Sequence, residues 1–129
     1  MANYTVGNGM QQIKMALDVD TIAMAASRAF VDNGPDNDLN PVAQSDNATG
    51  DIALKKIGAA FELQNHLLII ISRIGFFGSL KERKKQFEDL TAKCLLSEGD
   101  DGFKKFDEPE KRKVGNFDRA ELIYRIDFI

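Results

Sequence analysis

The sequence has one cysteine, one histidine and no tryptophan among its 129 residues. A single cysteine excludes an intramolecular disulfide, and one cysteine with one histidine cannot supply the ligands of a zinc cluster. We therefore expect a protein of a reducing compartment, the cytoplasm, whose fold depends on a hydrophobic core. Phenylalanine, which occurs nine times, supplies most of the aromatic side chains for that core.

The sequence also lacks a long apolar run. The densest apolar segment, residues 67–77, is about half of the roughly 20 residues that span a bilayer. The N-terminus has neither the basic region nor the apolar core of a signal peptide. We expect no membrane span and no secretory signal.

No charge of one sign dominates, because the net charge is only −3. Residues 1–50 hold two basic and six acidic side chains, residues 51–96 hold eight and five, and residues 97–129 hold seven and nine. Nucleic-acid-binding domains usually show one strongly basic face instead. Alternating blocks of this kind favour pairing between proteins or simply form solvated surfaces.

Residue patterns for catalysis or cofactor binding are absent or incomplete. A nucleophilic dyad would need Cys94 beside His66, but Cys94 lies in an apolar stretch where a buried, inert thiol is common. Asp36, Asp38 and Asn40 have the spacing of the first calcium ligands of an EF-hand, but the sixth position is proline and the twelfth is asparagine. There is no phosphate-binding glycine loop. We predict a protein that is not an enzyme and has no cofactor or metal.

Apolar residues recur every three or four positions over residues 9–30 and again over 51–77, which predicts two long helices. A turn-rich loop, residues 31–50, separates them; at this length it is either functional, mobile or packed as an ordered tip. The isoleucines at 69–71 are β-branched, so a strand over residues 67–72 is the alternative for part of the second helix.

Ser79 and Glu82 match a capping box, which predicts that a third helix starts at Ser79 and ends near residues 97–99. Residues 97–115 are so rich in charge that they indicate a connector. Residues 121–128 alternate in a pattern typical of a strand, and a short helix over 117–125 fits about as well. A free tail would not normally end in apolar residues, so we expect this segment to dock on the core or on a neighbour.

Together these patterns predict an all-α fold. The expected architecture is a small helical hairpin or bundle of about three helices, with a long loop at 31–50 and a docked C-terminal strand or helix. We predict a single domain over residues 1–129, made of a helical core (1–96), a charged connector (97–115) and a docking segment (116–129).

A segment that is apolar on nearly every side, as residues 67–71 are, must be covered from several directions. The first functional hypothesis is therefore a non-enzymatic interaction or assembly protein. It would self-associate through its helices, or serve as a small subunit or inhibitor in a larger protein complex. The predicted contact residues are Leu67, Ile70, Ile74, Phe77, Ile126 and Phe128.

The alternative hypothesis is a small nucleic-acid-associated accessory protein. Its candidate anion contacts form a basic cluster in the third helix, with a second basic run at residues 111–113. The cluster consists of Lys81, Arg83, Lys84 and Lys85.

Overall fold

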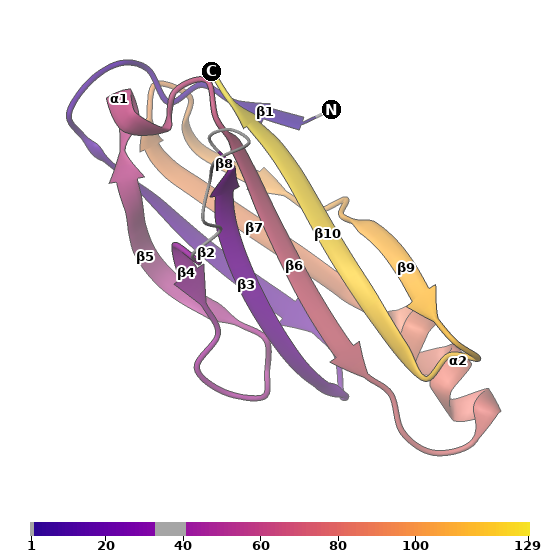
Figure 1. Cartoon of the computed structure of the whole chain (residues 1–129). Helices are drawn as coiled ribbons and strands as arrows, with labels where there is room; N and C mark the ends of the chain where they lie inside the picture. Colours follow the sequence, from indigo (N-terminus) through magenta and orange to yellow (C-terminus); the bar gives the residue numbers. More distant parts are fainter. Residues whose placement is uncertain (1, 33–40) are drawn as a thin grey trace.

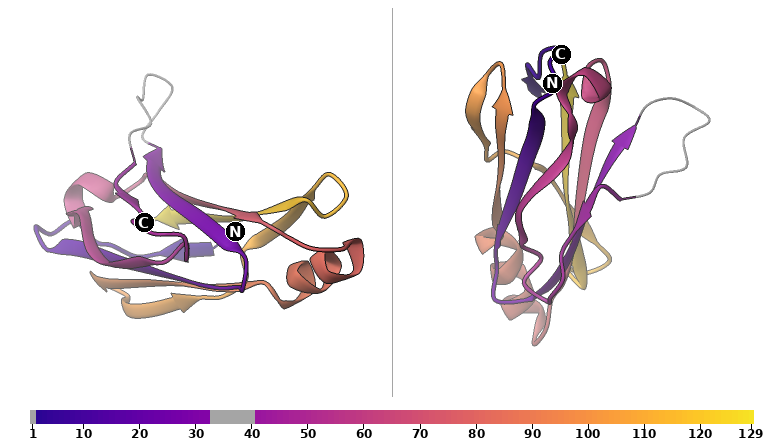
Figure 2. Two further views of the ribbon diagram at one scale, coloured as in Figure 1. Left: turned by 90° about the horizontal axis from the view of Figure 1, so that it is seen from below. Right: turned by 90° about the vertical axis from the view of Figure 1, so that its left-hand side faces the viewer.

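The computed structural model describes residues 2–32 and 41–129, and these fold as a β-sandwich (Figure 1). Ten strands form two sheets that pack face to face, with two short helices at the ends (Figures 1 and 2). The predicted all-α fold, a bundle of about three helices, is therefore wrong. No helix in the described part of the chain is both long and apolar enough to cross a membrane.

The larger sheet has six strands in the order β1-β10-β6-β3-β4, and β9 pairs with β10 on the same edge as β1. The strand pairs of this sheet are antiparallel, except that β1 runs parallel to β10, so the sheet is mixed. Its strands are β1 (Ala2–Tyr4), β3 (Met24–Asp32), β4 (Ala43–Gln44), β6 (Leu67–Gly75), β9 (Glu110–Val114) and β10 (Arg119–Phe128).

The smaller sheet is antiparallel and has the order β5-β2-β7-β8, so β5 and β8 are its edge strands. Helix α1 (Ala60–Leu63) follows β5, and helix α2 (Leu80–Asp89) connects β6 of the larger sheet to β7 of the smaller one. Its strands are β2 (Gln12–Asp20), β5 (Ile52–Ala59), β7 (Thr91–Gly99) and β8 (Gly102–Phe106).

Strands β2 and β3 replace the predicted helix at 9–30. In β2 the buried side chains alternate with exposed or partly exposed ones, which is the period of a strand with one face in the core. The helical interpretation relied on alanines, which fit either period. In β3 the inward positions carry small residues. Residues 48–50 pack against these small side chains, and a β-bridge pairs Thr49 with Ala25. The inward residues of β2 are Ile13, Met15, Leu17 and Val19.

Strand β6 lies at the centre of the larger sheet, between β10 and β3. The second predicted helix, at 51–77, is wrong, and the alternative of a strand over 67–72 is confirmed. β-branched isoleucines pack well on a pleated surface, and a central strand with apolar residues on both faces gives a continuous apolar run. Only the first turn after β5 is helical, as α1.

The predicted start of a helix at Ser79 is confirmed. Ser79 caps α2: its hydroxyl accepts a hydrogen bond from the Glu82 backbone N–H, and the Glu82 carboxylate accepts from the Ser79 backbone. The predicted end near residue 97 is wrong, because α2 ends at Asp89 and β7 begins at Thr91. Alternation of buried Ala92, Cys94 and Leu96 with more exposed neighbours makes this segment a strand.

The C-terminal segment is strand β10, which confirms the strand interpretation of residues 121–128 and its docking on the core. The predicted charged connector at 97–115 instead contains β8 and β9. Their charged side chains lie on solvated strands, where ion pairs such as Lys105–Asp107 form along the chain. Composition alone does not distinguish such solvated hairpins from a linker.

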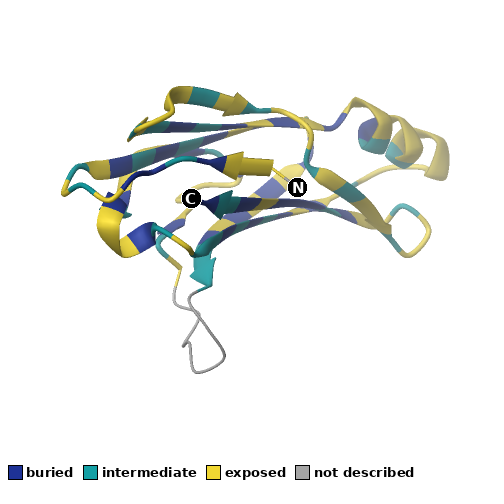
Figure 3. Ribbon diagram, turned by 90° about the horizontal axis from the view of Figure 1, so that it is seen from above, coloured by how far each residue is buried: buried dark blue, intermediate teal, exposed yellow. Residues whose placement is uncertain are grey.

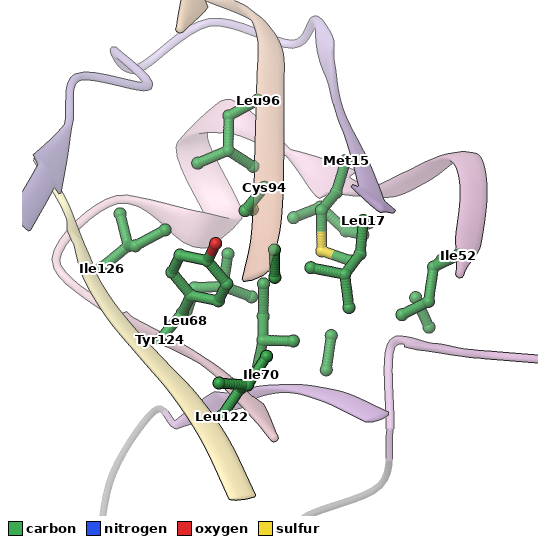
Figure 4. Close-up of a cluster of buried hydrophobic side chains, with 14 of the residues drawn as sticks. Met15, Leu17, Ile52, Leu68, Ile70, Cys94, Leu96, Leu122, Tyr124 and Ile126 are labelled. Atoms are coloured by element: carbon green, nitrogen blue, oxygen red, sulfur yellow. The ribbon is translucent and has the colours of Figure 1, made fainter. Parts of the chain in front are cut away.

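The core lies between the two sheets (Figure 3) and joins inward side chains from both (Figure 4). A buried polar pair in the core is satisfied internally: the Ser27 and Ser72 hydroxyls lie 2.7 Å apart. Of the predicted loop at 31–50, residues 33–40 lie outside the described part of the chain. Figure 4 labels ten of the core residues: Met15, Leu17, Ile52, Leu68, Ile70, Cys94, Leu96, Leu122, Tyr124 and Ile126.

The packing of the chain at Gly50 gives a stability prediction. A Cβ atom at Gly50 would lie 2.7 Å from the Ala25 Cβ, and the backbone there has φ +79°. We expect Gly50→Ala to lower the free energy of unfolding by about 1–3 kcal/mol. Denaturant unfolding measures this effect.

Gly75→Ala is the matched control, because a Cβ there meets nothing within 4 Å and the backbone is not left-handed. We expect Gly75→Ala to change stability by no more than about 0.5 kcal/mol, or to increase it slightly. Equal effects of the two substitutions would contradict the packing described for the segment at 48–50.

Candidate functional site

The outward side of the larger sheet, called here the outer face, holds five of the chain's six arginines. It consists of the residues of β3, β6, β9 and β10 that alternate away from the core. Lysines are absent from these outward positions in the described strands. The five arginines are Arg28, Arg73, Arg112, Arg119 and Arg125.

The centre of the outer face is apolar. Ile71 pairs with Ile123 on one side and with Arg28 on the other, and Ile69 pairs with Phe30. Ile123 is only 7% exposed although it points away from the sandwich core. A shallow hollow of about 210 Å³ lies over this centre, with Arg28 and Arg73 at its sides. Its remaining lining residues are Ala26, Phe30 and Ile71.

Ion pairs organise the β10 side of the outer face. The Glu110 carboxylate accepts hydrogen bonds from Arg125 at 2.7 Å and from Arg112 at 3.3 Å, and these bonds hold the pKa of Glu110 below its ordinary value. Arg73 lies 3.5 Å from Glu121. These pairs are solvent-exposed, so each contributes little to stability. They fix the guanidinium groups in position over the sheet.

Charge on the outer face is graded along the strands. Arg73 and Arg119 lie near the end of the sheet where β6 finishes, whereas Asp127 and Asp32 flank Leu67 at the other end. The apolar residues lie between these two ends. The outer face therefore has a basic end and an acidic end, and its middle combines the isoleucines with Arg28, Arg125 and Glu110.

A larger hollow, of about 590 Å³, adjoins the outer face along the edge of β10. Strand β1 pairs with β10 from Ile126 onward and β9 pairs with it only up to Ile123, so the hollow opens where neither strand covers β10. Glu110, Ile123 and Arg125 line it and also belong to the outer face. The other charged residues that line this hollow include both acidic and basic side chains, so their charge indicates no particular class of ligand.

The structure divides the six predicted contact residues between two environments. Ile70, Ile74, Ile126 and Phe128 are at most 1% exposed and lie in the core, where they pack against this chain. Leu67 points to the outer face and is half-buried, and Phe77 is 52% exposed in the connection before α2. The contact role of these residues stays a prediction. No partner can reach the four core residues without unfolding the chain.

The predicted basic cluster also divides. Lys85 pairs with Asp89 at 3.3 Å, while Arg83 turns back and donates to the Gly78 carbonyl at 2.7 Å and to the Asn116 carbonyl at 3.3 Å. Lys81 and Lys84 are exposed on α2. Arg83 is thus part of the fold, and the two lysines remain available to a ligand.

The residues tested for catalysis are not arranged for it. Cys94 is fully buried in the core, and burial raises the pKa of its thiol to about 12. His66 lies in the connection between α1 and β6, where its backbone carbonyl accepts from Phe128. Within residues 2–32 and 41–129, no group of three or more His, Cys, Asp or Glu side chains could hold a metal ion. The calcium-like spacing at Asp36, Asp38 and Asn40 lies outside the described residues.

Sequence reasoning missed the outer face. The signal was present as alternation: arginine, glutamate, isoleucine and arginine follow at every second position from Arg119 to Arg125. The same register continues in Ile69, Ile71 and Arg73. A helix over residues 51–77 would place Ile69, Ile71 and Arg73 at different angles around its axis, so the helical interpretation does not show the face that they share.

Comparison of the chain with protein-family models, with curated proteins and with solved structures finds no significant match.

Burial of Cys94 predicts an unreactive thiol. Nucleophilic attack needs the thiolate, and a raised pKa keeps the thiol protonated at about pH 8. We expect Ellman's reagent to label native protein at least about 100-fold more slowly than protein in concentrated guanidinium chloride. The raised pKa also makes the free energy of unfolding depend on pH. The contribution of Cys94 to stability is complete below about pH 9, the pKa of an exposed thiol, and is lost as the pH rises toward 12. Rapid labelling of the native protein would contradict the placement of Cys94.

Proposed function

We propose that the protein is a non-enzymatic assembly protein that forms a dimer through the outer face. The observation that carries this proposal is the apolar character of β6 on both sides. Its inward side chains are covered by the smaller sheet, whereas Leu67, Ile69 and Ile71 on the other side are only partly buried and no sheet or helix of the described residues packs over them. Strands with such continuous apolar runs are usually buried on both faces.

The composition of the outer face supports a protein partner. Arginine and aromatic residues are enriched at protein interfaces and lysine is depleted. The outer face has five arginines and Phe30, and its strands place no lysine there. The lysines of this chain lie elsewhere, including the edge strands β5 and β8, which carry Lys55, Lys56, Lys104 and Lys105.

The charge gradient favours a second copy as that partner. A two-fold axis that lies in the interface and runs across the strands makes the strands of the two copies antiparallel. The basic end with Arg73 and Arg119 then faces the acidic end with Asp127 and Asp32 of the other copy. Ile71 and Ile123, with Arg28 beside them, meet their counterparts in the middle, as in the aligned packing of two sheets.

The size of the outer face sets the expected affinity. Three strands of nine or ten residues and the five-residue β9, spaced about 4.8 Å apart, cover roughly 500 Å². A standard interface buries about 800 Å² on each partner. We therefore expect a dimer of moderate affinity, which calls for measurement at high protein concentration.

Light scattering of the untagged chain tests the proposal. We expect a mass near twice 14.3 kDa at a concentration of about 100 μM. Ile71→Asp should give a folded monomer, because it replaces an apolar side chain in the middle of the outer face with a charged one that would have to lose its hydration in the dimer. Circular dichroism verifies that the variant keeps its strands.

Leu54→Asp is the matched control. Leu54 is 62% exposed on β5 of the other sheet, so the same change of charge should leave the dimer intact. A wild-type monomer at this concentration, or an Ile71→Asp variant that keeps the dimer mass, would overturn the proposal. A monomeric Leu54→Asp variant would place the contact on the smaller sheet instead.

A further inference from the structure

The two basic runs of the sequence, at residues 81–85 and 111–113, meet at one end of the sandwich. Figure 1 shows α2 beside the end of β9 and the turn that leads into β10. The Arg83 guanidinium donates to Asn116 in that turn, and Lys111 Nζ donates to the Leu90 carbonyl just after α2 at 3.0 Å. We call α2 together with residues 110–119 the basic tip.

The Phe117 ring contacts lysines from both segments of the basic tip. Lys113 Nζ lies 4.5 Å from the centre of the Phe117 ring, and Lys84 Nζ lies 5.7 Å from it. The two ammonium groups are therefore at most about 10 Å apart. Each makes a cation–π contact, which offsets part of their mutual repulsion. Lys84 and Lys113 are exposed, so both can contact a ligand from solvent.

The turn that presents Phe117 is held in an unusual conformation. Phe117 has φ +58°, which is rare for a bulky side chain and costs of the order of 1–3 kcal/mol. Its ring packs edge-on against Phe87 of α2, with centroids 5.5 Å apart. This contact holds the turn against the helix, so the segments that carry Lys84 and Lys113 already lie together before any ligand arrives.

The basic tip differs in charge from the rest of the molecule. Residues 80–89 and 110–119 carry eight basic and five acidic side chains, a net charge of +3. The whole chain has a net charge of −3, so the remaining residues carry −6. A charge separation of this kind orients an approaching polyanion toward the basic tip.

We propose that the basic tip binds the sugar-phosphate backbone of a single-stranded nucleic acid, with Lys81, Lys84 and Lys113 as phosphate contacts. The Lys84 and Lys113 ammonium groups lie at most about 10 Å apart, so both can reach phosphates of one strand, and Lys81 supplies a third contact. Phe117 is occupied by lysines and by Phe87 and offers no free face for base stacking. Binding is therefore independent of base sequence.

The acidic residues of α2 favour a strand over a membrane surface. Glu82, Glu88 and Asp89 lie on the same helix as the lysines. A layer of anionic headgroups is a continuous plane and cannot avoid these carboxylates. A flexible strand can follow the lysines and pass beside them.

Fluorescence anisotropy with a labelled single-stranded oligonucleotide of mixed sequence tests this proposal. We expect binding at low salt that weakens with salt, with a slope of log K against log salt of about −2 for three phosphate contacts. Lys84→Gln with Lys113→Gln should weaken binding about tenfold and reduce the magnitude of the slope by about 1.4. Thermal melting verifies that this variant is folded.

Lys55→Gln with Lys56→Gln is the control, since these exposed lysines lie on β5, outside the basic tip. We expect it to bind as the wild type does. Absent binding at low salt, or equal binding by the two double variants, would overturn the proposal. Binding to phosphatidylserine vesicles without binding to the oligonucleotide would assign the basic tip to membranes instead. The oligonucleotide measurement does not depend on the dimer, because the monomeric Ile71→Asp variant retains every residue of the basic tip.

Discussion

The packing of β6 and β10 against β2 and β7 is the contact on which the rest of the structure depends. Because side chains alternate along a strand, placing Leu68, Ile70 and Ile74 in the core also places Ile69, Ile71 and Arg73 on the outer face. A shift of one residue would exchange the two sets. The core therefore determines which residues lie on the outer face.

The same packing positions the basic tip. Strand β6 ends at Gly75 and leads directly into the capped start of α2, and β10 begins just after the turn that carries Phe117. Since β6 and β10 pair along their whole length, the helix and the turn come together at one end. Two basic runs that seem unrelated in the sequence become one surface for this reason.

Short local motifs in the sequence predict the elements that they determine by themselves. The capping box at Ser79 and Glu82 located the start of α2, and alternation over 121–128 indicated β10. The helices at 9–30 and 51–77 were wrong because alanine and isoleucine fit a period of 3.6 and a period of 2 alike. In β2, strict alternation from Ile13 to Val19 was the better guide. The outer face and the basic tip depend on strand order, which no local pattern in this chain specified.

The lysine pairs of the edge strands have a consequence for how an assembly of this protein can grow. Strands β5 and β8 end the smaller sheet and leave backbone N–H and C=O groups unpaired, which is a template for adding further strands without limit. Lys55 and Lys56 on β5 and Lys104 and Lys105 on β8 set like charges along both borders. Strand-to-strand stacking into fibrils is thereby opposed, whereas the proposed association through the outer face would stop once two copies had paired.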